Sequence, residues 1–240
     1  MMSVFLDEVD STNEEAKRRA MAGEIGPLWI GAASQTHGRG RRGRNWVSQT
    51  GNLFATGLFS LENGVGSANI SFVAALAVAE VLECWVDASK IALKWPNDVL
   101  IEGNKTSGIL LESWLNNGLF QLAVGIGINI INAPDDTERR ATSISKHIKE
   151  NIDCPSPKLV MRHLMVAFER NLAILTTQGF SEIRKQWLKR AQGLGKAIIA
   201  RTHDKEICGI FEFLGENGEL LLRDNEKKLH QISAGDVFLL

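Results

Sequence analysis

Two residue types that often carry chemistry are scarce in this sequence, which has no tyrosine and only three cysteines in 240 residues. Without tyrosine, no phenol can act as an acid or a base. Cys84, Cys154 and Cys208 are odd in number, far apart and form no CxxC pair. The sequence therefore indicates neither a disulfide framework nor a zinc site, and we expect three thiols in a reducing cytoplasm.

An excess of one charge and a long hydrophobic run are also missing. The 27 lysines and arginines are balanced by 28 aspartates and glutamates, so the net charge of -1 creates no global field that would recruit nucleic acid or an anionic membrane. The longest apolar stretch, around 72–81, is interrupted by Glu80 and is too short to span a bilayer. The first residues lack the basic and apolar segments of a secretory signal. We expect a cytoplasmic globular chain.

The hydrophobic pattern predicts a mixture of strands and helices up to about residue 192. Ser11 and Glu14, or Thr12 and Glu15, stand at the spacing of a capping box, which predicts a helix that begins there and ends near Gly23. Further helices are expected at 67–85, 141–149, 158–175 and 181–190. Strands are expected at 4–6, 29–33, 52–59, 91–95, 99–102, 105–114 and 119–131.

The pattern changes after Gly193-Leu194-Gly195. Short strands are expected at 197–201, 206–214, 219–223 and 228–240, separated by polar turns. A module of about 48 residues is too small to bury a large core, so we expect it to dock on the rest of the chain. The predicted organisation is an α+β domain over residues 1–192, followed by a small β domain over residues 193–240.

Residues 38–44 read Gly-Arg-Gly-Arg-Arg-Gly-Arg, with four arginines and three glycines in seven residues. Glycine lets the backbone approach a ligand closely, and arginine supplies planar charged donors that suit carboxylate and phosphate. Trp46 follows, and an indole can stack on a purine ring. The composition alone fits an anion-binding loop, a nucleic-acid patch or a solvated run of charge.

A second polar segment, Lys94-Trp95-Pro96-Asn97-Asp98, ends a predicted strand. A lysine, an amide and a carboxylate at this density could hold a nucleotide phosphate and its Mg²⁺, although Pro-Asn-Asp is equally ordinary in a type I turn. Lys105 opens the next strand, where it would face back toward Asp98. It could stabilise charge at an acyl carbon or a phosphate, or it could be an exposed hairpin lysine.

Glycines also interrupt the apolar strand at Gly125-Ile126-Gly127-Ile128-Asn129, which suggests close approach of a ligand or a bulge. No third glycine opens a helix after them, so the segment is not a dinucleotide fingerprint. There is no GxxxxGK[ST] sequence, which excludes the usual P-loop route to ATP. The five histidines are scattered and give no metal-ligand spacing.

Taken in order, these segments resemble the biotin–protein ligase family (biotin–[acetyl-CoA-carboxylase] ligases). The resemblance covers nearly the whole chain. Its motifs are Ser11-Thr12-Asn13, Gln35 to Arg44 with Trp46, Lys94 to Asp98, Lys105 with Gly108-Ile109-Leu110, and Gly125 to Asn129. It implies a largely antiparallel mixed sheet with helices, similar to class II aminoacyl-tRNA synthetases, and a C-terminal SH3-like β-barrel.

The resemblance also implies a reaction in two steps. Biotin and ATP with Mg²⁺ would give biotinyl-5′-adenylate, and a lysine on the biotin carboxyl carrier domain of a carboxylase would then attack it. Lys105 would be the main catalytic cation, and Arg39 would meet the biotin carboxylate and the α-phosphate. Biotin would contact Ser11, Thr12, Asn13, Gln35, Gly38, Arg39, Gly40, Lys105, Gly108 and Gly127. The nucleotide would contact Arg41, Arg44, Trp46, Asn97, Asp98 and Asn129, with Asp98 also on Mg²⁺.

Some features depart from the family pattern. His37 stands where a small residue is common and Ser107 where alanine is common. The chain begins at the catalytic strand, so we expect no helix-turn-helix and no DNA binding. Family members pair through sheet edges in some cases, which leaves a homodimer open. The alternatives are a lipoate or octanoate ligase of the same superfamily and, from another class, a nucleic-acid-binding module.

Overall fold

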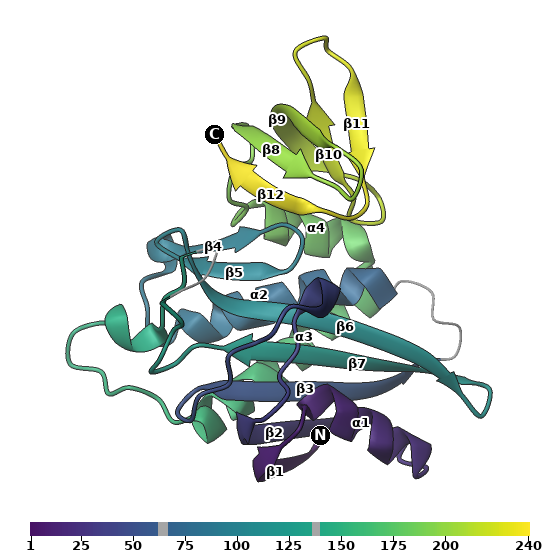
Figure 1. The fold of residues 1–240 in the computed structure, drawn as a ribbon, viewed down its shortest axis with the longest axis vertical. Coiled ribbons are helices and arrows are strands. Elements are labelled where there is room, and N and C mark those ends of the chain that lie inside the picture. The colour runs from purple at the N-terminus through teal and green to yellow at the C-terminus, as the bar shows by residue number, and fades with distance from the viewer. Residues whose placement is uncertain (62–66, 136–139) are drawn as a thin grey trace.

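The computed structural model describes residues 1–61, 67–135 and 140–240, which form two sheets and four α-helices (Figure 1). The larger sheet has seven strands in the order β1-β2-β3-β7-β6-β5-β4. Only β1 and β2 pair in parallel, and every other ladder in this sheet is antiparallel. The strands are β1 (Met2–Val9), β2 (Leu28–Gln35), β3 (Leu53–Leu61), β4 (Ile91–Lys94), β5 (Asp98–Ile101), β6 (Asn104–Asn116) and β7 (Leu119–Ile128). The predicted α+β class is confirmed.

The two faces of the large sheet differ because side chains alternate along each strand. In β7, Val124 and Ile126 point into the main core, which also contains residues of α2 (Ile70–Leu82) and α3 (Pro157–Gln178). Ala123 belongs to a smaller cluster on the other face, together with apolar residues of α1 (Thr12–Met21). The sheet is therefore covered by α2 and α3 on one face and only in part by α1 on the other, as Figure 1 shows.

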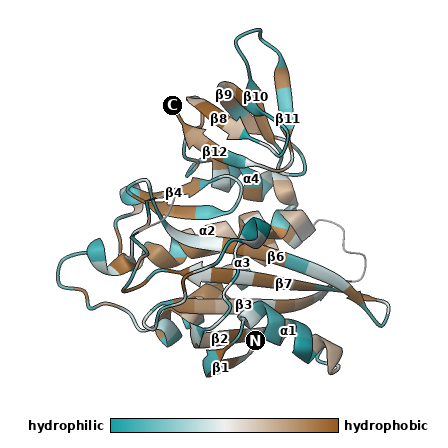
Figure 2. Ribbon diagram, viewed as in Figure 1, coloured by the Kyte–Doolittle hydropathy of each residue, from teal (hydrophilic) through white to brown (hydrophobic). Residues whose placement is uncertain are grey.

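Helix α2 is apolar on nearly all sides, which is typical of a helix buried in a core. It packs against the sheet, α3 and α4 (Phe180–Leu188). The hydropathy colouring shows this brown layer behind the sheet, whereas α1 carries more teal (Figure 2). No helix in the described ranges combines the length and apolarity needed to cross a membrane.

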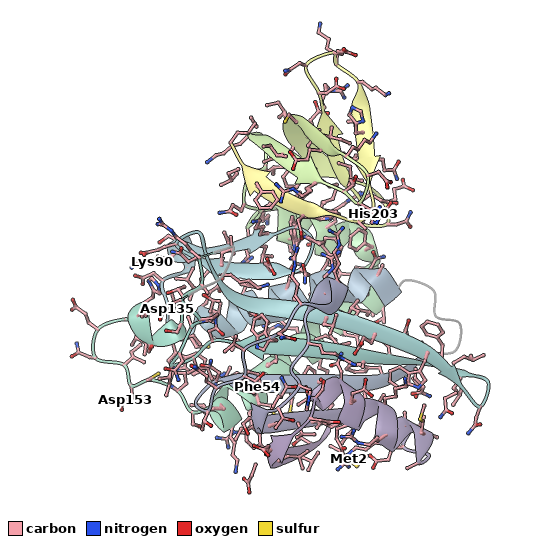
Figure 3. All side chains as sticks on the ribbon, in the orientation of Figure 1. Met2, Phe54, Lys90, Asp135, Asp153 and His203 are labelled. Carbon is pink, nitrogen blue, oxygen red and sulfur yellow. The ribbon has the colours of Figure 1, made fainter. Side chains whose placement is uncertain are left out.

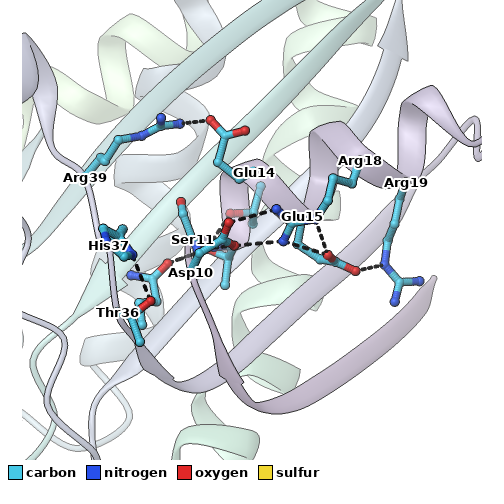
Figure 4. Close-up of polar contacts among 12 residues, drawn as sticks. Asp10, Ser11, Glu14, Glu15, Arg18, Arg19, Thr36, His37 and Arg39 are labelled. Carbon is cyan, nitrogen blue, oxygen red and sulfur yellow. Dashed lines mark hydrogen bonds and ion pairs between the residues drawn. The ribbon is translucent and has the colours of Figure 1, made fainter.

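Helix α1 begins where the sequence predicts, but without the predicted capping box. Ser11 occupies the N-cap position in an extended conformation, and its side chain makes no capping hydrogen bond. The backbone N–H of Ser11 instead donates to the carboxylate of Asp10 at 2.7 Å. Arg18, about two turns along the helix, also binds that carboxylate with both terminal nitrogens, at 2.8 Å (Figure 4). Asp10 therefore fixes the start of the helix that Ser11 was expected to cap.

Residues 141–149 were predicted to be helical, and this prediction is wrong. The segment is extended apart from one 3₁₀ turn, Ile144–Lys146. The backbone N–H of Lys105 donates to Arg140 O at 2.9 Å and the N–H of Thr142 to Lys105 O at 2.8 Å. Asn129 adds a side-chain hydrogen bond to Thr142 O at 3.1 Å. These tertiary hydrogen bonds replace the local ones of a helix, which helical periodicity alone cannot reveal.

The C-terminal residues form a five-stranded antiparallel sheet in the order β11-β10-β9-β8-β12. Its strands are β8 (Ala197–Arg201), β9 (Glu206–Leu214), β10 (Leu220–Arg223), β11 (Leu229–Ile232) and β12 (Asp236–Leu239). The single strand expected at 228–240 is thus two strands, separated around Gly235. A Cβ atom at Gly235 would lie 2.8 Å from Arg201 O, so the chain needs glycine to turn this closely over β8.

The small sheet is docked on the large one through the predicted Lys94–Asp98 segment. The indole of Trp95 is buried, and its Nε1 donates to Gly218 O at 3.0 Å. Arg184 in α4 donates to Leu214 O and Gly215 O, at 3.2 Å and 3.0 Å. These contacts bring the end of the chain, β12, beside the strands that carry the candidate site (Figure 1).

Candidate functional site

A pocket of about 260 Å³ opens on the face of the large sheet that α1 only partly covers. It contains every predicted site residue except Gly38. These are Ser11, Thr12, Asn13, Gln35, Arg39, Gly40, Arg41, Arg44, Trp46, Asn97, Asp98, Lys105, Gly108, Gly127 and Asn129. Residues not predicted as ligand contacts also line it, among them Arg42, Asn45, Phe54 (labelled in Figure 3) and Asp236. The fold therefore brings together, in one pocket, segments that lie far apart in the sequence.

The floor of the pocket, which we define as the lining residues Thr12, Asn13 and Gln35 together with Thr56, which hydrogen-bonds to two of them, is a network in which all but the half-buried Gln35 are buried. Thr12 donates to Gln35 Oε1 from its backbone nitrogen at 2.8 Å and from its hydroxyl at 3.1 Å. The hydroxyl of Thr56 has two acceptors in range, Thr12 Oγ1 at 2.8 Å and Asn13 Oδ1 at 2.6 Å. Because these side chains orient one another, the floor is already formed without a ligand.

Glycine is required on this face because other side chains lie directly against it. A Cβ atom at Gly125 would be 2.4 Å from Asn13 Oδ1, and one at Gly127 would be 2.4 Å from the indole of Trp46. Gly38 lies behind the pocket, where a Cβ atom would be 2.4 Å from Ser48 Oγ. The glycines predicted to allow close approach of a ligand thus also let Asn13 and Trp46 approach the sheet.

The rim of the pocket, which we define as Arg39, Arg41, Arg42 and Arg44, is held by acidic and amide side chains. Arg39 Nη2 lies 2.6 Å from Glu14 Oε1 and 3.2 Å from Glu112 Oε1 (the contact with Glu14 is drawn in Figure 4). Arg41 Nη1 donates to Asn97 Oδ1 at 3.2 Å. Arg44 Nη2 pairs with Asp236 Oδ2 at 2.8 Å, and Arg42 Nη1 lies 3.8 Å from the same oxygen.

Burial and neighbouring carboxylates shift the pKa values of the rim arginines in opposite directions. For Arg39, burial disfavours the charged form, but the hydrogen bond to Glu14 and the charges of Glu112 and Glu14 outweigh it and raise its pKa. For Arg41, burial dominates, and its pKa is lowered from the usual value for arginine. Both guanidinium groups remain cationic at neutral pH because arginine starts from so high a pKa.

Lys105 reaches the pocket because of a β-bulge. Residues 105 and 108 are three apart, so in a regular strand their side chains would point to opposite faces. The ladder between β5 and β6 pairs Val99 with Ser107 but Leu100 with Lys105, which leaves Thr106 as the extra residue. As a result, Lys105 Nζ lies only 3.2 Å from where a Cβ atom of Gly108 would be. The bulge re-aims the lysine onto the pocket face.

The ammonium group of Lys105 is enclosed by an acid and an aromatic ring. Its Nζ lies 2.6 Å from Asp98 Oδ1 and 5.3 Å from the ring centroid of Trp46. Asp98 is buried, whereas the Lys105 side chain is 25% exposed. The indole Nε1 of Trp46 is buried without a hydrogen-bond partner among the described residues. A buried N–H with no acceptor is unusual and is consistent with a side chain that packs against a ligand.

Histidine and metal-ligand clusters do not contribute to this site. Within the described ranges, no three His, Cys, Asp or Glu side chains gather as they would around a metal ion. His37 is exposed, and its ring contacts the hydroxyl of the neighbouring Thr36 at 2.9 Å, as Figure 4 shows. It does not line the pocket. The three cysteines are free and exposed.

Three residues that shape the site were not singled out from the sequence. Thr56 and Glu112 lie at alternate positions of β3 and β6 that face the pocket, so the period of two along each strand could have indicated them. Asp236 reaches the rim only because the small sheet docks beside it. No local pattern in the sequence reports such a contact.

A mixed sheet that carries a buried polar floor, a basic rim and an enclosed lysine defines a ligand-binding enzyme domain suited to anionic substrates. The model of the biotin/lipoate A/B protein ligase family matches residues 7–129, and that of the biotin protein ligase C-terminal domain matches residues 193–240. The chain belongs to the biotin/lipoate A/B protein ligase family and is an enzyme, which confirms the resemblance seen in the sequence.

Individual relatives extend this match to almost the full length. A biotin–[acetyl-CoA-carboxylase] ligase of Paracoccus denitrificans is 43% identical over 239 residues, which cover 98% of this chain and 99% of that protein. The bifunctional ligase/repressor BirA of Bacillus subtilis is 33% identical over 95% of this chain and 71% of its own length. The structure of biotin protein ligase from Aquifex aeolicus in complex with biotin and ATP has a TM-score of 0.80 at 29% identity, covering 100% of this chain and 98% of that one.

Proposed function

We propose that the protein joins biotin to a carrier protein in two steps. Biotin and MgATP give biotinyl-5′-adenylate and pyrophosphate, and the amine of a carrier lysine then attacks the acyl carbon and releases AMP. The carrier is the biotin carboxyl carrier domain of acetyl-CoA carboxylase or a related carboxylase. The observation that carries the proposal is the enclosure of Lys105 by Asp98 and Trp46 in a pocket that the rim arginines also line.

The electrostatics of the pocket suit the first step. A carboxylate and a triphosphate repel one another, so their reaction requires cations that are fixed before the substrates meet. Lys105 is the main catalytic cation and stabilises charge on the carboxyl and phosphoryl oxygens. Arg39 meets the biotin carboxylate and the α-phosphate. Closure of the rim over the product then keeps water from the mixed anhydride.

The remaining roles follow from position in the pocket. The floor side chains Thr12, Asn13 and Gln35, with Ser11, offer donors and acceptors to a ureido group, which carries both. Gly38, Gly40, Gly108 and Gly127 allow the close approach of backbone and rings around biotin. The nucleotide contacts Arg41, Arg44, Trp46, Asn97, Asp98 and Asn129. Trp46 is the residue best suited to pack on the adenylate, because it lines the pocket and a planar indole can stack on a purine ring.

Mg²⁺ enters this reaction as part of the nucleotide substrate. The ion usually keeps several waters and binds through one or two carboxylates together with substrate phosphates. Asp98, a buried carboxylate on the pocket wall with Asn97 beside it, fits that requirement for a single protein ligand. Its ion pair with Lys105 would then loosen as the metal and phosphates arrive.

We also take residues 1–192 as the catalytic unit and residues 193–240 as an accessory unit. The separate family matches and the separate sheets support this division. Asp236 gives the accessory unit a direct contact with the arginine rim.

Whether the enzyme uses biotin or lipoate is tested by the mass that is added to a carrier domain. The full chain is incubated with MgATP, a biotin carboxyl carrier domain and either biotin or lipoate, and the carrier is weighed by mass spectrometry. We expect a mass increase of one biotinyl group on one lysine, and pyrophosphate release that requires biotin. Addition of lipoate without biotin would refute the proposal, and so would binding of a short oligonucleotide with no adenylate formed.

A further inference from the structure

Glu112 is a pocket-side residue to which the reaction itself gives no role. It lies on β6 two positions after Leu110 and four after Gly108, so all three face the pocket side of the sheet. Its Oε2 accepts a hydrogen bond of 2.7 Å from Asn13 Nδ2, on the floor. Both of its oxygens also lie 3.2 Å from Arg39 Nη2, on the rim. One carboxylate therefore joins the floor to the rim.

The contact between Glu112 and Arg39 leaves part of the guanidinium available. Glu14 Oε1 also binds Nη2, at 2.6 Å, so all side-chain contacts of Arg39 within the described ranges use this one nitrogen. A guanidinium is planar, and with Nη2 occupied its Nε and Nη1, which lie on different edges, can each still donate a single hydrogen bond to a carboxylate. Holding Nη2 restricts the orientation of that plane before a substrate arrives.

The energetics favour a role in positioning over a role in stability. The side chains of Arg39 and Glu112 are 40% and 37% exposed. Ion pairs this open to solvent contribute about 0 to 1 kcal/mol to folding. In contrast, a misplaced guanidinium in a substrate site affects every step that depends on its direction.

We infer that Glu112 is the positioning residue that fixes Arg39 relative to the biotin floor, so that the remaining donors of the guanidinium, Nε and Nη1, are presented to the substrate carboxylate. Asn13 is held at the other end of the same link: it contacts Gly125 on the sheet and accepts from Thr56. Binding of a ligand to the floor and the orientation of Arg39 are then coupled through one carboxylate, that of Glu112. This inference rests on the proposed function, because it names the carboxylate of the acid substrate as the ligand of Arg39.

The experiment is a double-mutant cycle on adenylate formation, measured as pyrophosphate release by the full chain. Glu112→Gln should raise the KM for biotin about five- to tenfold, the size expected for one ordinary hydrogen bond, and leave the KM for ATP within about twofold. In an Arg39→Ala background, Glu112→Gln should add less than about twofold, because its effect passes through Arg39.

Two further variants separate positioning from general charge. Glu14→Gln removes a carboxylate from Arg39 without touching Asn13, so its effect on the KM for biotin should be smaller than that of Glu112→Gln. Glu212→Gln is the matched control, because Glu212 also pairs with an arginine, Arg223 at 2.6 Å, but in the small sheet. It should leave both KM values unchanged. All single variants should unfold within about 2 °C of the wild type, since the altered ion pairs are exposed and a glutamine amide oxygen can still accept from Asn13.

Three outcomes would overturn the inference: an unchanged KM for biotin in Glu112→Gln, equal effects of Glu14→Gln and Glu112→Gln, or additive effects of Glu112→Gln and Arg39→Ala. Each outcome is compared with the wild-type protein, which is expected to release pyrophosphate only when biotin is present. Wild-type protein that fails to do so would refute the proposed function instead, so the two failures are distinguishable.

Discussion

The floor and the rim of the pocket are both polar, but they are built in opposite ways. Thr56, Thr12 and Asn13 on the floor are 0%, 4% and 5% exposed and hydrogen-bond to one another. On the rim, the side chains of Arg39 and Arg44 are 40% and 50% exposed and pair with carboxylates from distant segments. The floor lies on helices and strands, whereas the rim lies on a loop with one short 3₁₀ turn, Arg41–Gly43.

This difference suits the two regions to two tasks. The floor is suited to recognise the acid substrate, and the rim is suited to bind and exchange its charged groups. A buried network keeps its geometry because breaking one of its hydrogen bonds leaves a polar group without a partner. A guanidinium paired at the surface loses little when an incoming carboxylate or phosphate replaces its protein carboxylate. The floor is thus suited to recognise an uncharged group of fixed shape, and the rim is suited to exchange anions during a reaction.

The largest effect is expected at Lys105, where the two regions meet. Lys105→Met keeps a side chain of similar length against Trp46 but removes the cation that we propose faces both substrates. Adenylate formation should fall by about 10² to 10³, as is typical when one preorganised electrostatic group is lost. The measurement is single-turnover pyrophosphate release at saturating biotin and MgATP.

Lys90→Met is the matched control, because Lys90 also pairs with a carboxylate, Glu102 at 3.0 Å, but lies outside the pocket (Figure 3). Its rate should equal that of the wild type. If Lys105→Met released pyrophosphate at the wild-type rate, the catalytic cation would have to be found on the rim alone.

The position of Lys105 also shows what the sequence could and could not predict. Its proximity to Asp98 followed from the expected hairpin, and most strands followed from alternating hydrophobicity. The bulge at Thr106 that aims its side chain was not visible, because one extra residue leaves no signal in a pattern of period two. Helicity at 141–149 was predicted wrongly because Lys105 and Asn129 supply hydrogen bonds from outside that segment.

Contacts that depend on the docking of the small sheet could not be predicted from the sequence at all. Asp236 follows Arg44 by 192 residues, and it pairs with Arg44 only because Trp95 and Arg184 anchor the small sheet. The motifs themselves were readable through their resemblance to a known family in order and spacing, whereas the run of glycine and arginine alone fitted three interpretations. What their residues contact before a ligand arrives is a property of the assembled fold.

The next largest effect is expected on the floor. Thr56→Val keeps the shape of the side chain but removes the only hydroxyl that lies within hydrogen-bond distance of both Thr12 Oγ1 and Asn13 Oδ1 among the described residues. The loss should raise the KM for biotin about tenfold, which corresponds to the roughly 1–3 kcal/mol cost of an unsatisfied buried group. The KM for ATP should not change.

Ser107→Ala provides the control in the same sheet. The Ser107 hydroxyl is also fully buried but has no hydrogen-bond partner among the described residues, so its removal leaves no group unsatisfied. Both KM values should remain at the wild-type level. Equal KM values for biotin in Thr56→Val and the wild type would mean that the floor does not depend on this network.

A smaller effect is expected on the rim from Asp236→Asn. The carboxylate of Asp236 is the partner of Arg44 at 2.8 Å, and an amide would hold the guanidinium less tightly. The loop should open more often, so that trypsin cuts after Arg41, Arg42 or Arg44 about fivefold faster in the ligand-free protein. Asp224→Asn, which alters an acid paired with His230 in the small sheet, should leave the cleavage rate unchanged. A rate for Asp236→Asn equal to that of the wild type would show that Asp236 does not restrain the rim.

The smallest effect concerns the support beneath the floor, where Asp10 fixes the start of α1. The hydrogen bonds from Arg18 outweigh the opposing effect of burial and lower the pKa of Asp10 to about 2, from an ordinary value of 3.8. A lowered pKa in the folded state stabilises the protein above the unfolded pKa, and this contribution is lost as the pH falls from about 4 toward 2. Its side chain is 42% exposed, so solvent screening limits the gain to about 1 kcal/mol.

Urea unfolding of wild type and Asp10→Asn at several pH values measures this contribution. The variant should be about 1 kcal/mol less stable at pH 7, and the difference should shrink below pH 4 as the wild-type carboxylate becomes protonated. Asp153→Asn removes an exposed carboxylate far from α1 (Figure 3) and should change stability by less than about 0.5 kcal/mol at every pH. A difference for Asp10→Asn that stays constant from pH 7 to pH 2 would show that the loss does not come from the charge, because Asp10 is the only titrating group by which the two proteins differ.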